Sequence, residues 1–168
     1  MSDDQYYYEP AQGHGLPHDP FNAIIGRKDS LNNIERTGEF AWNLVTRPLA
    51  EAMNQSCAAV SPEVDEFELS NLTPVASRRI AVPRVAQSPV SFECKVTQIL
   101  QLQGANGDTV PTWLVLGEVV AVHIAKALLK DGIYDTAAAE PVLRGGGPAD
   151  YFQPGPESLF RMWRPSMN

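Results

Sequence analysis

Residues 90–124 read VSFECKVTQILQLQGANGDTVPTWLVLGEVVAVHI and carry the clearest structural signal in the chain. In the first half, apolar residues alternate with polar ones, which predicts a long β-strand with one face exposed to water. The alternating apolar residues are Val90, Phe92, Cys94, Val96, Leu100 and Leu102. The stretch GANGD at 104–108 predicts a turn, and the run 112–124 predicts the return strand of an antiparallel hairpin.

The return strand is apolar on both faces except for Glu118 and His123. A strand with two apolar faces needs cover on each side. We therefore expect it in the wall of a barrel, or between a sheet and a partner subunit.

Upstream of the hairpin the pattern changes to helix, strand and helix. Leu31 and Ile34 have helical spacing within 29–38, and Gly38 closes that segment. A strand is expected over 40–45 (FAWNLV), and a second helix from Pro48 to Pro62. Residues 61–88 contain several prolines and charges, so this segment is expected at the surface with short extended pieces.

The two ends of the chain have a different composition. Residues 1–20 contain glycines and prolines, which predicts an extended arm, and 21–25 is an apolar run that suits a short strand. After the hairpin we expect a helical piece near 125–130 and a turn at 131–132. The sequence therefore predicts an N-terminal arm (1–20) followed by a single domain (21–168).

Composition narrows the class of protein. Of 168 residues, 43% are hydrophobic, and 13 Lys and Arg face 20 Asp and Glu, for a net charge of −7. This balance argues against nucleic acid or an anionic membrane as the main partner. No apolar run approaches the roughly 20 residues that span a bilayer, and the start, MSDDQYYYEP, differs from a secretory signal. We therefore expect a cytoplasmic protein.

Motifs that identify common enzyme classes by sequence are absent: there is no P-loop, dinucleotide glycine fingerprint, GxSxG elbow or HExxH helix. His14, His18 and Asp19 lie in the Gly/Pro-rich arm without a second ligand cluster, so no metal site is expected.

The segment GRKDSLNNIERTGEF (26–40) suggests an anion site. Arg27 and Lys28 precede a predicted helix whose first turn offers free N–H groups and the Ser30 hydroxyl. The alternative is that Asp29 or Ser30 only caps the helix and both cations are solvated.

Several motifs in order resemble those of the flavin reductase-like family, whose fold is an FMN-binding split β-barrel. They are KDSLNNIERTGEFAWNLV at 28–45, GEVVAVHI at 117–124, LRGGGPADYF at 143–152 and a closing Arg-Pro at 164–165. The resemblance covers residues 21–165. It implies a mainly β, Greek-key-like fold with helices.

The resemblance also implies a set of cofactor-binding residues. Lys28, Asp29 and Ser30 match the family's residues at the FMN phosphate and ribityl chain, with Arg27 as an added cation and Asn33 as a lesser candidate.

A late glycine-rich loop near the flavin and the partner subunit is matched by Arg144, Gly145, Gly146 and Tyr151, although a surface turn explains the glycines equally well. His123 is a candidate for nicotinamide contact, and the alternative is a histidine satisfied within the core.

One departure from the family pattern lies between Ile25 and Gly26. Family members continue there into two to three further strands, roughly forty residues, which supply part of the barrel wall and of the cradle for the flavin ring. Here Ile25 is followed directly by Gly26. The barrel is therefore expected to be incomplete.

By resemblance the function is an FMN-binding reductase in which NADH or NADPH passes a hydride to the flavin, in a homodimer. No side chain is needed as acid or base, so no catalytic residue is assigned. The alternative is a non-catalytic homodimeric remnant of the barrel that binds flavin weakly or not at all. A third interpretation is a redox carrier that holds FMN without reducing it from a nicotinamide.

Overall fold

The computed structural model describes Tyr7, Gln12, residues 26–147 and residues 149–165. The helices are α1 (Asp29–Thr37), α2 (Ala50–Gln55) and α3 (Glu66–Leu69), with 3₁₀ turns η2 (Arg47–Leu49), η3 (Lys126–Leu128) and η4 (Pro156–Ser158). The strands are β1 (Glu39–Asn43), β2 (Pro74–Val75), β3 (Arg84–Val85), β4 (Val90–Gln103), β5 (Thr109–Ile124), β6 (Leu129–Lys130), β7 (Ile133–Tyr134), β8 (Leu143–Gly146) and β9 (Asp150–Phe152). The strand expected at 21–25 and nearly all of the expected arm lie outside the described residues.

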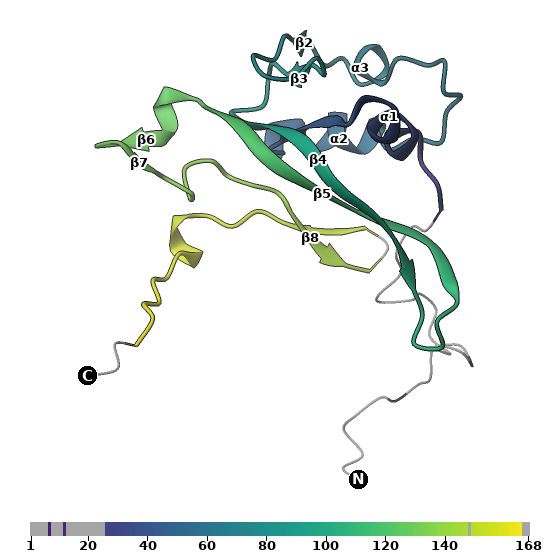
Figure 1. The fold of residues 1–168 in the computed structure, drawn as a ribbon. Coiled ribbons are helices and arrows are strands. Elements are labelled where there is room, and N and C mark those ends of the chain that lie inside the picture. Colours follow the sequence, from purple (N-terminus) through teal and green to yellow (C-terminus); the bar gives the residue numbers. More distant parts are fainter. Residues whose placement is uncertain (1–6, 8–11, 13–25, 148, 166–168) are drawn as a thin grey trace.

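The predicted hairpin is confirmed as β4 and β5, the longest elements of the chain (Figure 1). The two strands pair antiparallel from Val90 opposite Ile124 to Gln103 opposite Thr109. The Gly104 N–H closes the turn by donating to the Asp108 carbonyl at 2.8 Å. β1 pairs with the other edge of β4, so the central sheet has the order β1-β4-β5.

Helix α1 is joined to this sheet by Gly38. The helix ends there because Gly38 adopts the left-handed conformation (φ 69°), and its N–H donates to the Ile34 carbonyl at 2.8 Å. The Gly38 carbonyl in turn accepts from the Val96 N–H of β4 at 2.8 Å. The C-terminal end of α1 is therefore held at a fixed place relative to the sheet.

Two predicted helices are shorter than expected. The helix expected from Pro48 to Pro62 is η2 followed by α2, which ends at Gln55. The N–H groups of Cys57 and Ala58 then bond to carbonyls three residues earlier, so the chain turns instead of continuing the helix. The helical piece expected at 125–130 is only η3, after which the chain enters β6 and the expected turn before β7.

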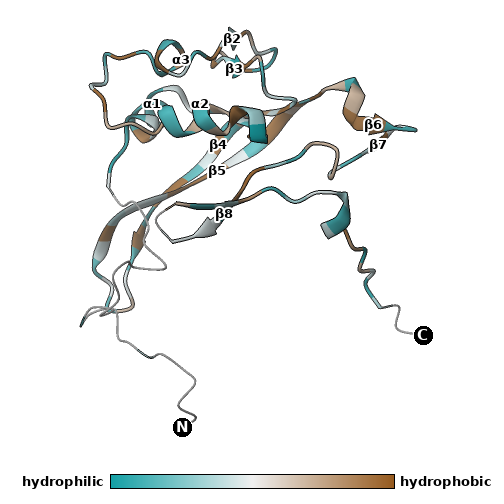
Figure 2. Ribbon diagram, turned by 180° about the vertical axis from the view of Figure 1, so that it is seen from behind, coloured by the Kyte–Doolittle hydropathy of each residue, from teal (hydrophilic) through white to brown (hydrophobic). Residues whose placement is uncertain are grey.

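Few hydrophobic residues are buried in the described part of the chain: Leu31, Ile80, Val90, Cys94, Leu128 and Ala139. Of these, Val90, Leu128 and Ala139 pack together as one cluster with partly buried neighbours. Apolar residues on the sheet remain uncovered. Trp42 of β1 is paired with Phe92 of β4, which is paired in turn with Val122 of β5. Trp42 is 43% exposed and Val122 is 52% exposed. Figure 2 shows hydrophobic residues, in brown, along the β4-β5 ribbon. The described residues therefore do not supply the cover that β5 was expected to need.

The sheets of the described residues do not close into a barrel. One has three strands and the other three have two each, so β1 and β5 are both edges of the central sheet. In Figures 1 and 2, α1, α2 and the β2-β3 hairpin lie above the β4-β5 ribbon and β8 lies below it. Among the described helices, none is long and apolar enough to cross a membrane.

Candidate functional site

The first turn of α1 brings three of the predicted residues to one cavity. Lys28, Asp29 and Ser30 are exposed and line a cavity of about 450 Å³, together with Arg27, residues 56–60 and Glu66. Lys28 precedes the helix in an extended conformation, and no side chain caps the helix. The N–H groups of Leu31 and Asn32 donate to the Lys28 carbonyl at 3.0 and 3.3 Å, whereas those of Asp29 and Ser30 have no carbonyl of the helix to bond to. The Lys28 cation, the Ser30 hydroxyl and these two free N–H groups therefore lie together at the start of the helix.

Arg27 lines this cavity, but its guanidinium is already engaged. Its Nε donates to Asn32 Oδ1 at 2.7 Å, it pairs with Glu35, and it lies 5.5 Å from the centre of the Trp113 ring. Lys28 makes no ion pair with any described residue, so it is the cation of the pair that is available to an anion. Asn33 does not line the cavity, and its side chain accepts from Arg36 at 3.3 Å.

The late glycine-rich residues form a hairpin of β8 and β9. Arg144 lies opposite Tyr151, with its guanidinium 5.0 Å from the ring centre, and it donates to the carbonyls of Gly147 and Asp150. A Cβ on Gly145 would meet the Phe152 ring at 2.5 Å, so a larger residue there would displace this exposed ring.

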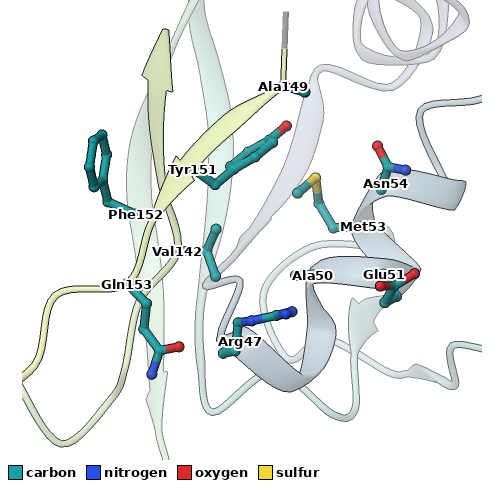
Figure 3. A pocket seen from close by; sticks show the side chains of 10 residues that line it. All are labelled: Arg47, Ala50, Glu51, Met53, Asn54, Val142, Ala149, Tyr151, Phe152 and Gln153. Atoms are coloured by element: carbon teal, nitrogen blue, oxygen red, sulfur yellow. The ribbon is translucent and has the colours of Figure 1, made fainter. Parts of the chain in front are cut away.

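Tyr151 borders a second cavity of about 420 Å³, between this hairpin and α2. Figure 3 shows its ring directed toward Met53 and Asn54 of α2, whereas Phe152 points away. Arg144, Gly145 and Gly146 do not line this cavity, so Tyr151 is the one predicted residue that borders it. It is separate from the α1 cavity, because one is bordered by residues 50–54 and the other by residues 56–60.

His123 lies in a buried ionic cluster around Glu93. His123 Nε2 is 2.6 Å from Glu93 Oε1, and the Glu93 carboxylate also accepts from the N–H groups of Arg78 (2.9 Å) and Arg79 (2.6 Å). Glu93 is completely buried. Burial alone would raise its pKa, but the hydrogen bonds outweigh that effect and lower the pKa to about 2.

The expectation that Glu93 and Ser91 lie on a water-exposed face of β4 is wrong, since both are buried. The reason is tertiary, because the segment 78–84 lies against this part of the strand. Glu93 is the residue that the sequence interpretation missed. The sequence offers one indication of this cluster, which is a possible charge pairing. Glu93 is a carboxylate in the predicted strand, and Arg78-Arg79 is a basic pair in a segment expected at the surface.

In the described part of the chain, no three His, Cys, Asp or Glu side chains are grouped so that they could hold a metal ion. His14, His18 and Asp19 lie outside that part. Cys94 is buried and Cys57 is exposed, where it borders the α1 cavity.

Comparison with known proteins agrees with the motif pattern. The family model for the flavin reductase like domain matches residues 21–141. An uncharacterized protein of Halalkalibacterium halodurans is 37% identical over 120 residues, which cover 71% of this chain and 57% of that protein.

Among solved structures, nitrilotriacetate monooxygenase component B from Bacillus cereus superposes with a TM-score of 0.72 at 29% identity, covering 81% of this chain and 65% of that one. A Shewanella frigidimarina protein described as a flavin reductase with split barrel domain gives 0.64 at 25% identity, covering 83% and 65%. The fold is thus a mainly β split barrel, and the chain spans less than two thirds of the length of each of these three proteins.

Proposed function

Because the chain belongs to the flavin reductase-like domain family, we propose that it binds FMN and reduces it with NADH or NADPH. The observation that carries this proposal is the convergence of Lys28, Ser30 and the free amides of α1 on one cavity of about 450 Å³. A phosphate dianion suits such a group, since helix N-termini and lysine both favour negative charge. Asp29 carries a negative charge that repels a phosphate, so phosphate binding depends on the Lys28 cation, the Ser30 hydroxyl and the N–H groups.

When bound, FMN would supply the redox chemistry, as the acceptor of a hydride from the nicotinamide. The side chains of the protein would bind FMN and the nicotinamide and orient them toward each other. Lys28 and Ser30 would hold the phosphate end, and the rigid junction at Gly38 would fix that end against the sheet. For Arg144, Gly145, Gly146 and Tyr151 we propose contacts farther along the flavin. His123 is our candidate for contact with the nicotinamide.

A second candidate function is a non-catalytic homodimeric remnant of the barrel that binds flavin weakly or not at all. The observation in its favour is that the described strands form an open three-stranded sheet. The visible absorption spectrum of the purified protein separates the two candidates. Flavin bands at about one per chain, with oxidation of NADH or NADPH on addition, support the reductase, and absence of binding to added FMN supports the remnant.

Replacing both Lys28 and Ser30 by alanine should weaken FMN binding by about 2–4 kcal/mol, because two hydrogen bonds to the phosphate, one of them charge-assisted, are lost. Fluorescence titration of FMN measures the change. The matched control is Lys126→Ala with Ser158→Ala, which removes the same groups from residues that do not line the cavity. Equal FMN affinity in the cavity variant and the native protein would contradict the phosphate assignment.

We further propose a homodimer, because apolar residues of the sheet are uncovered in the described part of the chain. Light scattering at micromolar concentration should report twice 18.4 kDa. Val122→Arg places a charge on the uncovered face and should shift the protein toward the monomer. Val64→Arg, at a residue of similar exposure outside the sheet, should not. A stable 18.4 kDa monomer of the native chain would refute the proposal.

A further inference from the structure

A third cavity, of about 650 Å³, lies between the segment 78–84 and the paired ends of β4 and β5. Three arginines, Arg78, Arg79 and Arg84, line it together with His123. The whole chain has 13 Lys and Arg and a net charge of −7, so this is a local concentration of positive charge in an acidic protein.

Glu93, the carboxylate nearest to these arginines, forms an ion pair with Arg84 but not with the guanidinium groups of Arg78 and Arg79. Glu93 is completely buried, and it holds the backbone N–H groups of Arg78 and Arg79, not their side chains. The guanidinium groups of Arg78 and Arg79 form no ion pair with any described residue. Their charges are therefore available to a ligand.

Arg84 is the arginine of the three that is already engaged. Its buried Nε lies 3.7 Å from Glu93 Oε1 in an ion pair, and its Nη2 donates to the Ala76 carbonyl at 3.2 Å. The charges open to a ligand in this cavity are therefore those of Arg78 and Arg79.

We propose that this cavity binds a phosphate group of a nicotinamide dinucleotide. Guanidinium groups match phosphate oxygens in geometry and charge. The volume is within the range of cavities that hold cofactor-sized ligands. The choice of a dinucleotide rests on the proposed function, because His123, our candidate for nicotinamide contact, lines the same cavity.

The test is Arg78→Ala combined with Arg79→Ala, with NADP⁺ and NAD⁺ titrated separately by calorimetry. Affinity for the dinucleotide should fall about 10- to 100-fold, because two charged donors are removed. A loss for NADP⁺ alone assigns the arginines to the 2′-phosphate, and a loss for both assigns them to the pyrophosphate. Each result supports the proposal.

Three controls make the result specific. Alanine retains the backbone N–H groups that bind Glu93, so the thermal midpoint of the double variant should match the native one. Arg161→Ala with Arg164→Ala removes the same charge from exposed residues outside the cavity and should leave dinucleotide affinity unchanged. Arg78→Lys with Arg79→Lys should recover part of the affinity, because it keeps the charge without the planar fork.

Native affinity for both dinucleotides in the alanine variant would overturn the proposal, and so would failure of the native chain to bind either one. FMN binding is measured on the same samples. If the alanine variant keeps native affinity for both dinucleotides, only this inference fails. If the native chain binds FMN but neither dinucleotide, the nicotinamide dependence of the proposed function fails with it, while the FMN site stands. If arginine-dependent dinucleotide binding occurs without FMN binding, the inference stands and the proposed flavin site fails.

Discussion

Replacing Glu93 by alanine should lower the free energy of unfolding by about 3–5 kcal/mol, the typical cost of removing one member of a buried ionic cluster. The variant leaves the N–H groups of Arg78 and Arg79 without their acceptor and the side chain of Arg84 without its ion-pair partner. Urea denaturation measures the difference. Glu118→Ala is the matched control on the paired strand, where the side chain is exposed and the change should be within about 0.5 kcal/mol. Similar effects of the two substitutions would contradict the role of Glu93.

The same carboxylate predicts a dependence of stability on pH. The pKa of Glu93 is lowered from an ordinary value of 4.5 to about 2 in the folded chain, so the folded state binds this proton less readily than the unfolded state. Its contribution is fully present above about pH 4.5 and is lost as pH falls toward about 2. Thermal midpoints between pH 7 and pH 3 should therefore fall more steeply for the native chain than for Glu93→Gln. Parallel curves would show that Glu93 does not contribute to acid sensitivity.

Restoring the segment that the family carries between Ile25 and Gly26 should raise the thermal midpoint by about 10 °C or more, a gain of several kcal/mol for a chain of this size. The physical reason is the two edges of the central sheet, β1 and β5, whose outer N–H and C=O groups have no strand beside them among the described residues. The Gly26 N–H already donates to the Pro111 carbonyl of β5 at 2.7 Å, so the junction lies against one of these edges.

Flavin occupancy should rise in the restored protein as well, because the segment is expected to supply part of the cradle for the flavin ring. The segment can be taken from a family member that carries it, and a Gly/Ser insert of equal length is the control for the insertion itself. Visible absorbance and differential scanning calorimetry are measured side by side. If the native chain equals the restored one in both, it closes its fold without the segment, and the deletion interpretation is wrong.

Local patterns predicted the elements that depend on local chemistry. The alternation in 90–103 and the turn at 104–108 produced β4 and its hairpin, and Gly38 ended α1 where expected. The burial of Glu93 could not be read in this way, because alternation assigns a residue to a face but does not say what covers that face. The cover comes from segment 78–84, whose contact with β4 is not encoded in any repeat.

In the candidate site, too, local features could be predicted from the sequence, whereas features that depend on tertiary contacts could not. Lys28 and Ser30 are neighbours in the sequence, so their convergence at a helix start could be predicted. The engagement of Arg27 could not, because its partner Glu35 lies two helical turns away and its ring contact, Trp113, is on β5. Likewise, the separation of Tyr151 from the α1 cavity depends on where α2 lies.

The register of the central sheet also constrains how the chain folds. The β4-β5 pairs are closed by a short turn, whereas β1 must bring residue 39 to residue 95 across a long intervening segment. Closing a long loop costs more chain entropy than closing a short one, so we expect the hairpin to form first and β1 to dock onto it later. The hairpin lies entirely downstream of Gly26. A chain with the additional segment and a chain without it would therefore begin folding by the same step, and would differ only in how much structure is added to the hairpin afterwards.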